Sequence, residues 1–333
     1  MRVVAAVDKF RGTATGAEIA SAIGHACWEH GHECVEFALA DGGEGLLDVL
    51  GGPNRTTTVT GPLGAPVEAA WRFASGTAII EMARASGLLL AGGADGNDPM
   101  EATTAGTGQL IDAALTAGAN RIIVGLGGSA TTDGGLGAIQ AISSPQRLKG
   151  VELLVACDVT TRFTDAAVVF GPQKGARPAQ VKMLTRRLEQ LAERYAREFG
   201  VDVTEIEGSG AAGGIAGALA ALGGVLTPGF ELVADELDLF DALEGADLVI
   251  TGEGHLDEQS FRGKVVGGVA DVAAELQMPV AAIVGIADDD VRDRLPTWVI
   301  AERFGEERAV REPLWCVEQV TGEIVRQFAP PDA

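Results

Sequence analysis

Apolar and polar positions follow one another at both ends of this chain in the order strand, loop, helix. The apolar run at residues 3–7 predicts a strand, and residues 17–29 place apolar side chains every four positions, which predicts a helix. Near the other end, the apolar runs 246–250 and 280–284 flank a helix predicted at residues 264–276. Strands that alternate with helices in this way are typical of parallel βαβ units.

The pattern changes between residues 56 and 73. Threonine and valine alternate there on both sides of a Gly-Pro-Leu-Gly turn, which predicts an antiparallel hairpin. Further βα units follow, and the clearest helix is predicted at residues 178–199, with Gly200 as its stop. We therefore expect an α/β protein with a domain junction near residue 58.

Composition agrees with two domains and limits the classes of partner. The 333 residues are 47% hydrophobic, enough for a large core, and chains of this length commonly form about two domains. A formal net charge of −22 repels nucleic acid and anionic membrane surfaces. The four cysteines lack metal-type spacing and are expected to be reduced. Asp8 and Lys9 cut the first apolar run short, so we predict no signal or membrane segment and expect a cytoplasmic protein.

Glycine-rich loops at strand ends are the first candidates for chemistry. Residues 127–135 (GGSATTDGG) follow an apolar strand and precede an apolar helical run, a place where backbone amides favour anions. The loop fits neither the Walker A motif nor the dinucleotide GxGxxG motif. Taken alone, it is equally compatible with a structural turn and a phosphate site. Residues 209–214 (SGAAGG) have the same character, and close helix packing explains their small side chains slightly better.

Charged loops form a second group of candidates. Asp41 and Glu44 lie on a turn directly after a strand, where open α/β sheets collect ligands, although surface turns often carry such residues. Residues 251–264 combine carboxylates, hydroxyls and two cations after a buried strand, and here we favour a functional role over a surface loop. Lys174 stands between glycines, where it could bridge phosphate oxygens or lie on a solvated turn.

Nine short blocks occur in order along nearly the whole chain: DKFRGT (8–13), ADGGEG (40–45), TGPLG (60–64), TTAGTG (103–108), GLGGSATTDGG (125–135), ACDV (156–159), FGPQKGA (170–176), GSGAAGG (208–214) and ITGEGHLDEQSFRGK (250–264). Together they resemble the bacterial glycerate kinase family of the two-domain type that lacks a Walker loop. Each block is modest alone, but their shared order is specific.

The resemblance implies a fold and an activity. It implies an α/β fold in which both chain ends, residues 1–58 and 240–333, form a Rossmann-like domain with a parallel sheet. Residues 59–239 would then form an inserted second α/β domain. The implied activity is ATP-dependent phosphorylation of glycerate with Mg²⁺, at an active site in the cleft between the domains.

Phosphoryl transfer requires anion cradles, neutralising cations and a carboxylate near the attacking hydroxyl, and the matched motifs offer residues for each role. We assign the ATP phosphates to Gly127, Gly128, Ser129, Thr131 and Lys174, with Gly213 and Gly214 as weaker contributors. The acceptor is assigned to Asp8, Lys9, Arg11 and Glu44, with Asp257 as an acceptor or metal candidate. Asp41 is the expected base or Mg²⁺ partner, Lys264 is expected to stabilise transferred charge, and the further metal candidates are Asp158 and Glu253.

Two departures from the family pattern concern the acceptor. Where the family usually reads DSFKGS, this chain reads DKFRGT, so Lys9 adds a cation at the expected acceptor pocket. Residues 160–165 replace the usual N-P-L-x-G run. These changes keep a second hypothesis open, in which the protein is a kinase of another polyol, sugar acid or phosphorylated cyclitol. A third hypothesis is an inactive nucleotide-binding regulator. We expect a monomer or homodimer that binds a small hydroxylated molecule and neither nucleic acid nor membranes.

Overall fold

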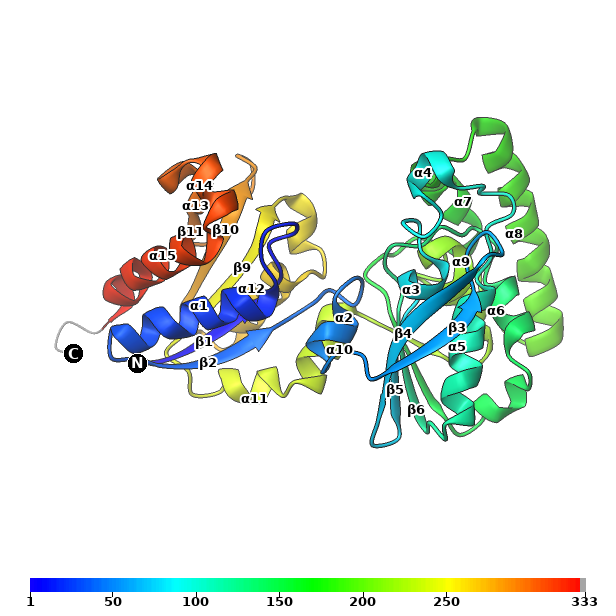
Figure 1. The fold of residues 1–333 in the computed structure, drawn as a ribbon, viewed down its shortest axis with the longest axis horizontal. Coiled ribbons are helices and arrows are strands. Elements are labelled where there is room, and N and C mark those ends of the chain that lie inside the picture. Colours follow the sequence, from blue (N-terminus) through cyan, green and yellow to red (C-terminus); the bar gives the residue numbers. More distant parts are fainter. Residues whose placement is uncertain (330–333) are drawn as a thin grey trace. The chain divides into compact units, whose positions relative to one another are not determined.

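The computed structural model describes residues 1–329, which divide into two compact units that each contain one sheet (Figure 1). Unit 1 contains residues 1–41 and the chain from residue 229 onward, and unit 2 contains residues 42–228. Both units are α/β, which confirms the predicted fold class. Within residues 1–329, no helix has the length and apolar character needed to cross a lipid bilayer.

Unit 1 is built on a parallel five-stranded sheet in the order β11-β10-β9-β1-β2. Its strands are β1 (Arg2–Val7), β2 (Glu33–Ala38), β9 (Leu248–Leu256), β10 (Val280–Ala287) and β11 (Thr297–Val299). Strands from the two ends of the chain are neighbours, because β1 pairs with β9 from Val3 opposite Leu248 onward. The Rossmann-like domain made from both chain ends is therefore present.

Helices cover both faces of this sheet. They are α1 (Gly16–Glu29), α10 (Gly229–Glu236), α11 (Leu239–Leu243), α12 (Val265–Glu275), α13 (Ile300–Phe304), α14 (Glu306–Arg311) and α15 (Pro313–Phe328). Ile19 of α1 and Val320 of α15 share one apolar core with Ile250 of β9. Val266 of α12 belongs to a separate core together with Val284 of β10. Ile283, the residue before Val284, belongs to the first core, because successive side chains of a strand point to opposite faces of the sheet.

Unit 2 contains a mixed six-stranded sheet in the order β3-β4-β5-β6-β7-β8. Its strands are β3 (Arg55–Thr60), β4 (Pro66–Ala74), β5 (Thr77–Glu81), β6 (Arg121–Gly125), β7 (Glu152–Ala156) and β8 (Val225–Thr227). β3 and β4 form the predicted antiparallel hairpin, and the pairs from β5 to β8 are parallel.

The helices of unit 2 include short turns and one long amphipathic helix. They are α2 (Leu46–Val49), α3 (Ala83–Ser86), α4 (Gly93–Gly96), α5 (Ala105–Thr116), α6 (Leu136–Ala141), α7 (Ala166–Phe170), α8 (Pro178–Phe199) and α9 (Ala211–Ala221). The structure confirms α8 at its predicted bounds. Proline begins this helix and Gly200, with a φ of 73°, ends it, since both residues suit those positions.

The change between units falls at residues 41/42 and 228/229, and not near residues 58 and 240 as expected. The first difference arises because β3 pairs with β4, and β4 pairs with β5, so the hairpin belongs to the sheet of unit 2. The second arises because Phe230 of α10 packs on Gly268 of α12, where an added Cβ would lie 2.3 Å from the phenyl ring. The alternation pattern predicted the hairpin but not the sheet that it joins.

Candidate functional site

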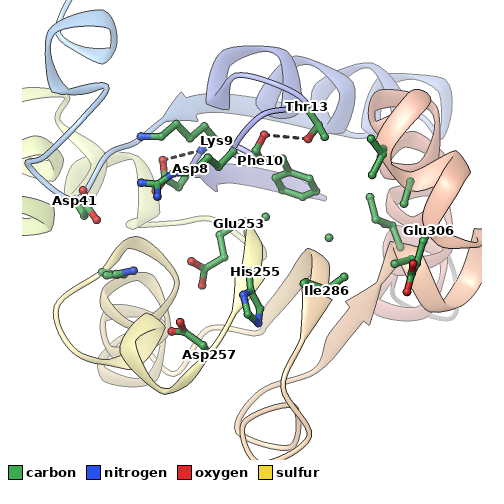
Figure 2. A pocket seen from close by; sticks show the side chains of 18 residues that line it. Asp8, Lys9, Phe10, Thr13, Asp41, Glu253, His255, Asp257, Ile286 and Glu306 are labelled. Atoms are coloured by element: carbon green, nitrogen blue, oxygen red, sulfur yellow. Dashed lines mark hydrogen bonds between the residues drawn. The ribbon is translucent and has the colours of Figure 1, made fainter. Parts of the chain in front are cut away.

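The strand order of unit 1 creates a crevice between β1 and β9. From β1 the chain continues to β2 on one side, and from β9 it continues to β10 and β11 on the other. In open parallel sheets, ligands bind at such a switch point, outside the carboxyl ends of the strands. A pocket of about 660 Å³ lies there and is lined by residues of β9, β10, α13 and α14 and of the segments that follow β1, β2 and β9 (Figure 2).

The loop after β1 brings three charged side chains to this pocket: Asp8, Lys9 and Arg11. The amide of Asp8 donates to Gly252 O at 2.9 Å, which fixes the loop to β9. The loop then turns back tightly, because the amides of Thr13 and Ala14 both donate to Phe10 O. Gly12 has a φ of 81° within this turn, a conformation that glycine adopts without steric cost.

Close backbone approach at Gly254 lets the same loop lie against β9. A Cβ at this position would lie 3.1 Å from the amide nitrogen of Arg11 and 3.2 Å from Phe10 Cα. The flanking residues of β9, Glu253 and His255, both line the pocket. The TGEG sequence therefore serves a structural purpose as well as supplying a carboxylate.

Glu253, which is buried, and Asp8, which is half-buried, form an acidic part of the pocket (Figure 2). Glu253 is 9% exposed, and its Oε1 has no hydrogen-bond partner among the residues that the structure describes. Burial raises the pKa of Glu253 to about 7, while Ser260 and Lys264 lower it. Burial also raises the pKa of Asp8 to about 6, against the influence of Lys9, whose amide donates to Asp8 Oδ1 at 2.7 Å.

Seven of the predicted site residues meet in this one pocket of unit 1. They are Asp8, Lys9, Arg11, Asp41, Glu253, Asp257 and Lys264. Asp257 also has a structural role, because its Oδ1 accepts the amides of Gln259 at 2.8 Å and Ser260 at 3.0 Å and so caps the short helix η4 (Glu258–Phe261). Four carboxylates and three cations in one concave site can bind an anionic ligand together with a metal ion.

The sequence did not single out several residues that complete this pocket: Phe10, Thr13, His255, Ile286, Glu306 and Val310. Phe10 and His255 lie inside two of the nine family-like blocks, but roles were assigned only to the charged residues beside them. Glu306 and Val310 lie on α14, and no local pattern connects that helix with the strand ends.

Unit 2 places the glycine-rich loop 127–135 after β6, as predicted, but the polar groups of this loop mainly contact one another. Lys174 is 2% exposed, and its Nζ donates to Thr131 O at 2.6 Å and to Ser129 Oγ at 3.3 Å. Burial lowers the pKa of Lys174 to about 7, against the influence of Asp133. In this arrangement Lys174 holds the loop in place, and its contact with phosphate stays a prediction.

Asp133 is a half-buried carboxylate that sequence reasoning did not assign. Its Oδ2 accepts the amide and the hydroxyl of Thr104 at 2.9 and 2.8 Å and the amide of Gly137 at 3.2 Å, and its Oδ1 accepts the amide of Gly135 at 3.0 Å. The side chain therefore connects the loop with the start of α5 and α6. The only available signal was its place between hydroxyls and glycines.

Gly213 and Gly214 lie beside the same loop for reasons of packing. Their φ angles are 78° and 98°, and a Cβ on Gly213 would lie 2.0 Å from Thr131 O. A Cβ on Gly214 would lie 2.8 Å from Gly134 Cα. These contacts favour the packing interpretation of this segment.

Of the remaining predicted residues of unit 2, Gly127 lies close to Glu44, because an added Cβ would be 3.0 Å from the amide nitrogen of Glu44. Gly127 lies against Gly43, because an added Cβ would be 2.8 Å from Gly43 Cα, and Gly128 has a φ of 67°. Glu44 is exposed on the loop between β2 and α2, and Asp158 is half-buried after β7. Within residues 1–329, no group of three or more His, Cys, Asp or Glu side chains is placed to hold a metal ion by itself.

A comparison with protein families and known proteins gives consistent results. The model of the glycerate kinase family matches residues 3–145 and 143–301. The chain is 40% identical over 331 residues to glycerate 2-kinase of Escherichia coli K12, with 87% of each chain covered. It is 38% identical over 330 residues to a glycerate kinase of Bacillus subtilis 168, covering 87% of this chain and 86% of the relative.

The fold is shared with a solved structure. A crystal structure of a protein assigned as glycerate kinase 2 from Salmonella typhimurium LT2 superimposes with a TM-score of 0.84 at 35% identity, and the match covers 98% of both chains. The family model extends across the strand ends of unit 1 and the glycine-rich loop of unit 2. The chain belongs to the glycerate kinase family.

Proposed function

We propose that this chain transfers the γ-phosphoryl group of ATP to a hydroxyl group of glycerate. The observation that carries the proposal is the presence of two carboxylates, the buried Glu253 and the half-buried Asp8, at the switch point of unit 1, with Lys9, Arg11 and Lys264 lining the same pocket. Enzymatic phosphoryl transfer depends mainly on positioning and on neutralising negative charge, and these residues supply the charged groups that it needs. The relatives named as glycerate kinases support the acceptor.

The residues of the pocket fit a nucleotide-bound magnesium ion. Mg²⁺ in kinases commonly takes one or two carboxylates and completes its coordination with water and substrate phosphates. Glu253 Oε1, buried without a partner among the described residues, and Asp8 would hold the ion. When bound, Mg²⁺ neutralises charge on the transferring phosphoryl group.

The protein side chains divide the remaining work. Lys9, Arg11 and Lys264 neutralise phosphate oxygens and the carboxylate of glycerate. The hydroxyl oxygen of glycerate forms a bond to the γ-phosphorus, the bond to the bridging oxygen breaks, and ADP leaves. Asp41, which also lines the pocket, accepts the hydroxyl proton.

The proposal is tested by measuring ADP release from ATP and Mg²⁺ with glycerate, other sugar acids, polyols and phosphorylated cyclitols. We expect turnover with glycerate, and phosphorus NMR of the product then identifies the phosphorylated hydroxyl. Glu253→Gln should abolish most of this turnover, while Glu275→Gln, an exposed residue on α12, should retain it. Absence of turnover with every acceptor would contradict the proposal and support a nucleotide-binding regulator.

A second candidate acceptor is a hydroxylated molecule that already carries phosphate. Lys9 and Arg11 both line the pocket, and together they would favour an acceptor with additional negative charge. In the same panel, a higher kcat/KM for a phosphorylated cyclitol than for glycerate would favour this alternative.

A further inference from the structure

The pocket of unit 1 has two ends of different chemistry (Figure 2). At one end lie Asp8, Asp41 and Glu253. The other end is lined by apolar side chains from the loop after β1, from β10 and from the two helices α13 and α14. These are Phe10, Ile286, Ile300, Ala301, Ala309 and Val310.

Two of the apolar side chains are unusually exposed for their type. Ile286 is 47% exposed and Val310 is 61% exposed, and both face the same pocket. Single exposed apolar residues are common on protein surfaces, but exposed apolar side chains that converge on one concave site are typical of ligand-binding pockets. This end of the pocket therefore offers an apolar surface that a flat, weakly hydrated group would cover.

The pocket is larger than glycerate alone would need. Glycerate is a three-carbon acid without an apolar part, whereas the pocket measures about 660 Å³. Pockets of about 300–1,000 Å³ commonly hold drug-sized or cofactor-sized ligands, with an apolar lining and a few polar groups that fix orientation. A ligand that matches both ends needs an apolar ring system at one end and several negative charges at the other.

We propose that the apolar end holds the adenine base of the nucleotide, with its phosphates directed to Lys9, Arg11 and Lys264. This rests on the proposed kinase function and assigns to unit 1 a subsite that the motifs in the sequence did not indicate. Ile286 and Val310, the two exposed apolar side chains, contact the faces of the ring. Glu306, which lines the same end, accepts a hydrogen bond from the exocyclic amino group of adenine.

The proposal also predicts base selectivity. Guanine carries a carbonyl oxygen where adenine carries its amino group, and a carboxylate at Glu306 would repel that oxygen. Glu306→Gln replaces one acceptor by a donor that can face the carbonyl. The ratio of the affinities for ADP and GDP should therefore decrease by about tenfold or more in this variant, because one hydrogen bond commonly contributes a factor of this size to affinity.

Calorimetric titration of the full-length protein with Mg²⁺-ADP and with Mg²⁺-tripolyphosphate tests the subsite without requiring turnover. Val310→Asp places a charge on the ring surface at an exposed position, so the fold should be retained. We expect ADP to bind about tenfold or more weakly, while tripolyphosphate, which lacks a base, changes less than about twofold. The matched control is Leu276→Asp, because Leu276 is 43% exposed in the same unit and does not line the pocket.

The outcomes separate this subsite from the kinase function. Unchanged ADP binding in Val310→Asp, or equal weakening of ADP and tripolyphosphate, would overturn the subsite even if the protein phosphorylates glycerate. Weaker ADP binding in Val310→Asp alone supports the subsite, even if no acceptor is phosphorylated and the proposed function fails. Equal weakening in Leu276→Asp would attribute the effect to general destabilisation and would also overturn it.

Discussion

The pocket of unit 1 and the glycine-rich loop of unit 2 look alike in sequence but differ in what their polar groups do. Both follow parallel strands and combine glycines with carboxylate and hydroxyl side chains, and a lysine lies beside each of them. In unit 1, Glu253 keeps an unpartnered oxygen beside an open pocket. In unit 2, Lys174 donates to Thr131 O and Asp133 accepts from Thr104. A motif therefore shows which groups are present, and only the fold shows which remain available to a ligand.

The largest effect should follow from Glu253→Gln in unit 1. Removal of the charge that faces the metal and the phosphates should lower kcat with glycerate by about 100-fold to 1,000-fold, the range for loss of one preorganised electrostatic group. Stability should not fall, because glutamine is nearly isosteric and needs no buried charge. Steady-state ADP release and thermal unfolding measure the two properties separately. A variant with full activity would place the chemistry elsewhere.

Asp133→Asn should have its main effect on stability. The amide offers only one acceptor oxygen, so at least one of the donors from Thr104, Gly135 and Gly137 would lose its partner. An unsatisfied buried donor costs about 1–3 kcal/mol, which urea unfolding can resolve. Asp112→Asn, at a more exposed position of the same unit, is the control. Equal stability of the Asp133 variant and the wild type would show that the loop does not depend on this carboxylate.

The pH dependence of stability should reveal the buried Lys174. Its pKa falls from 10.5 in the unfolded chain to about 7 in the folded protein, so between these values the unfolded state binds one more proton. Stability relative to Lys174→Met should therefore increase as pH rises from 7 toward 10.5. Urea unfolding of both proteins at several pH values measures the difference. A difference that stays constant would mean that Lys174 remains charged when folded.

The smallest effect should follow from Lys9→Ser, which restores the residue usual in the family. Lys9 is half-buried, so solvent screening limits its contribution to about 0.2–1 kcal/mol. The KM for glycerate or ATP should therefore rise by no more than about fivefold. A phosphorylated acceptor should be affected more strongly than glycerate if Lys9 contacts its phosphate. Equal effects on all acceptors would assign Lys9 to the nucleotide.

The elements with strong local signals could be predicted from the sequence. The helix at residues 178–199 has an apolar stripe, a proline at its start and a glycine at its end, so its bounds depend on local chemistry. The position of the domain junction could not be predicted, because it depends on which sheet the hairpin joins. Hairpin formation is local, whereas the pairing of β4 with β5 and the packing of Phe230 on Gly268 are tertiary contacts.

The same distinction applies to the candidate site. Asp8 and Glu253 were predicted because they directly follow or end apolar strands, and strand ends converge in a parallel sheet. Ile286 and Val310 carry no chemical signal, and only the fold brings β10 and α14 to one pocket. The role of Lys174 was also beyond the sequence, because a lysine between glycines gives no indication of whether its ammonium group is buried.

The most direct measurement is a crystal structure of the full-length protein with Mg²⁺, a non-hydrolysable ATP analogue and glycerate. The adenine ring should lie between Ile286 and Val310, with Mg²⁺ next to Glu253 and the phosphates beside Lys264. Density for the nucleotide on the loop 127–135, with the pocket of unit 1 lacking nucleotide and metal, would contradict both the subsite and the role of Glu253.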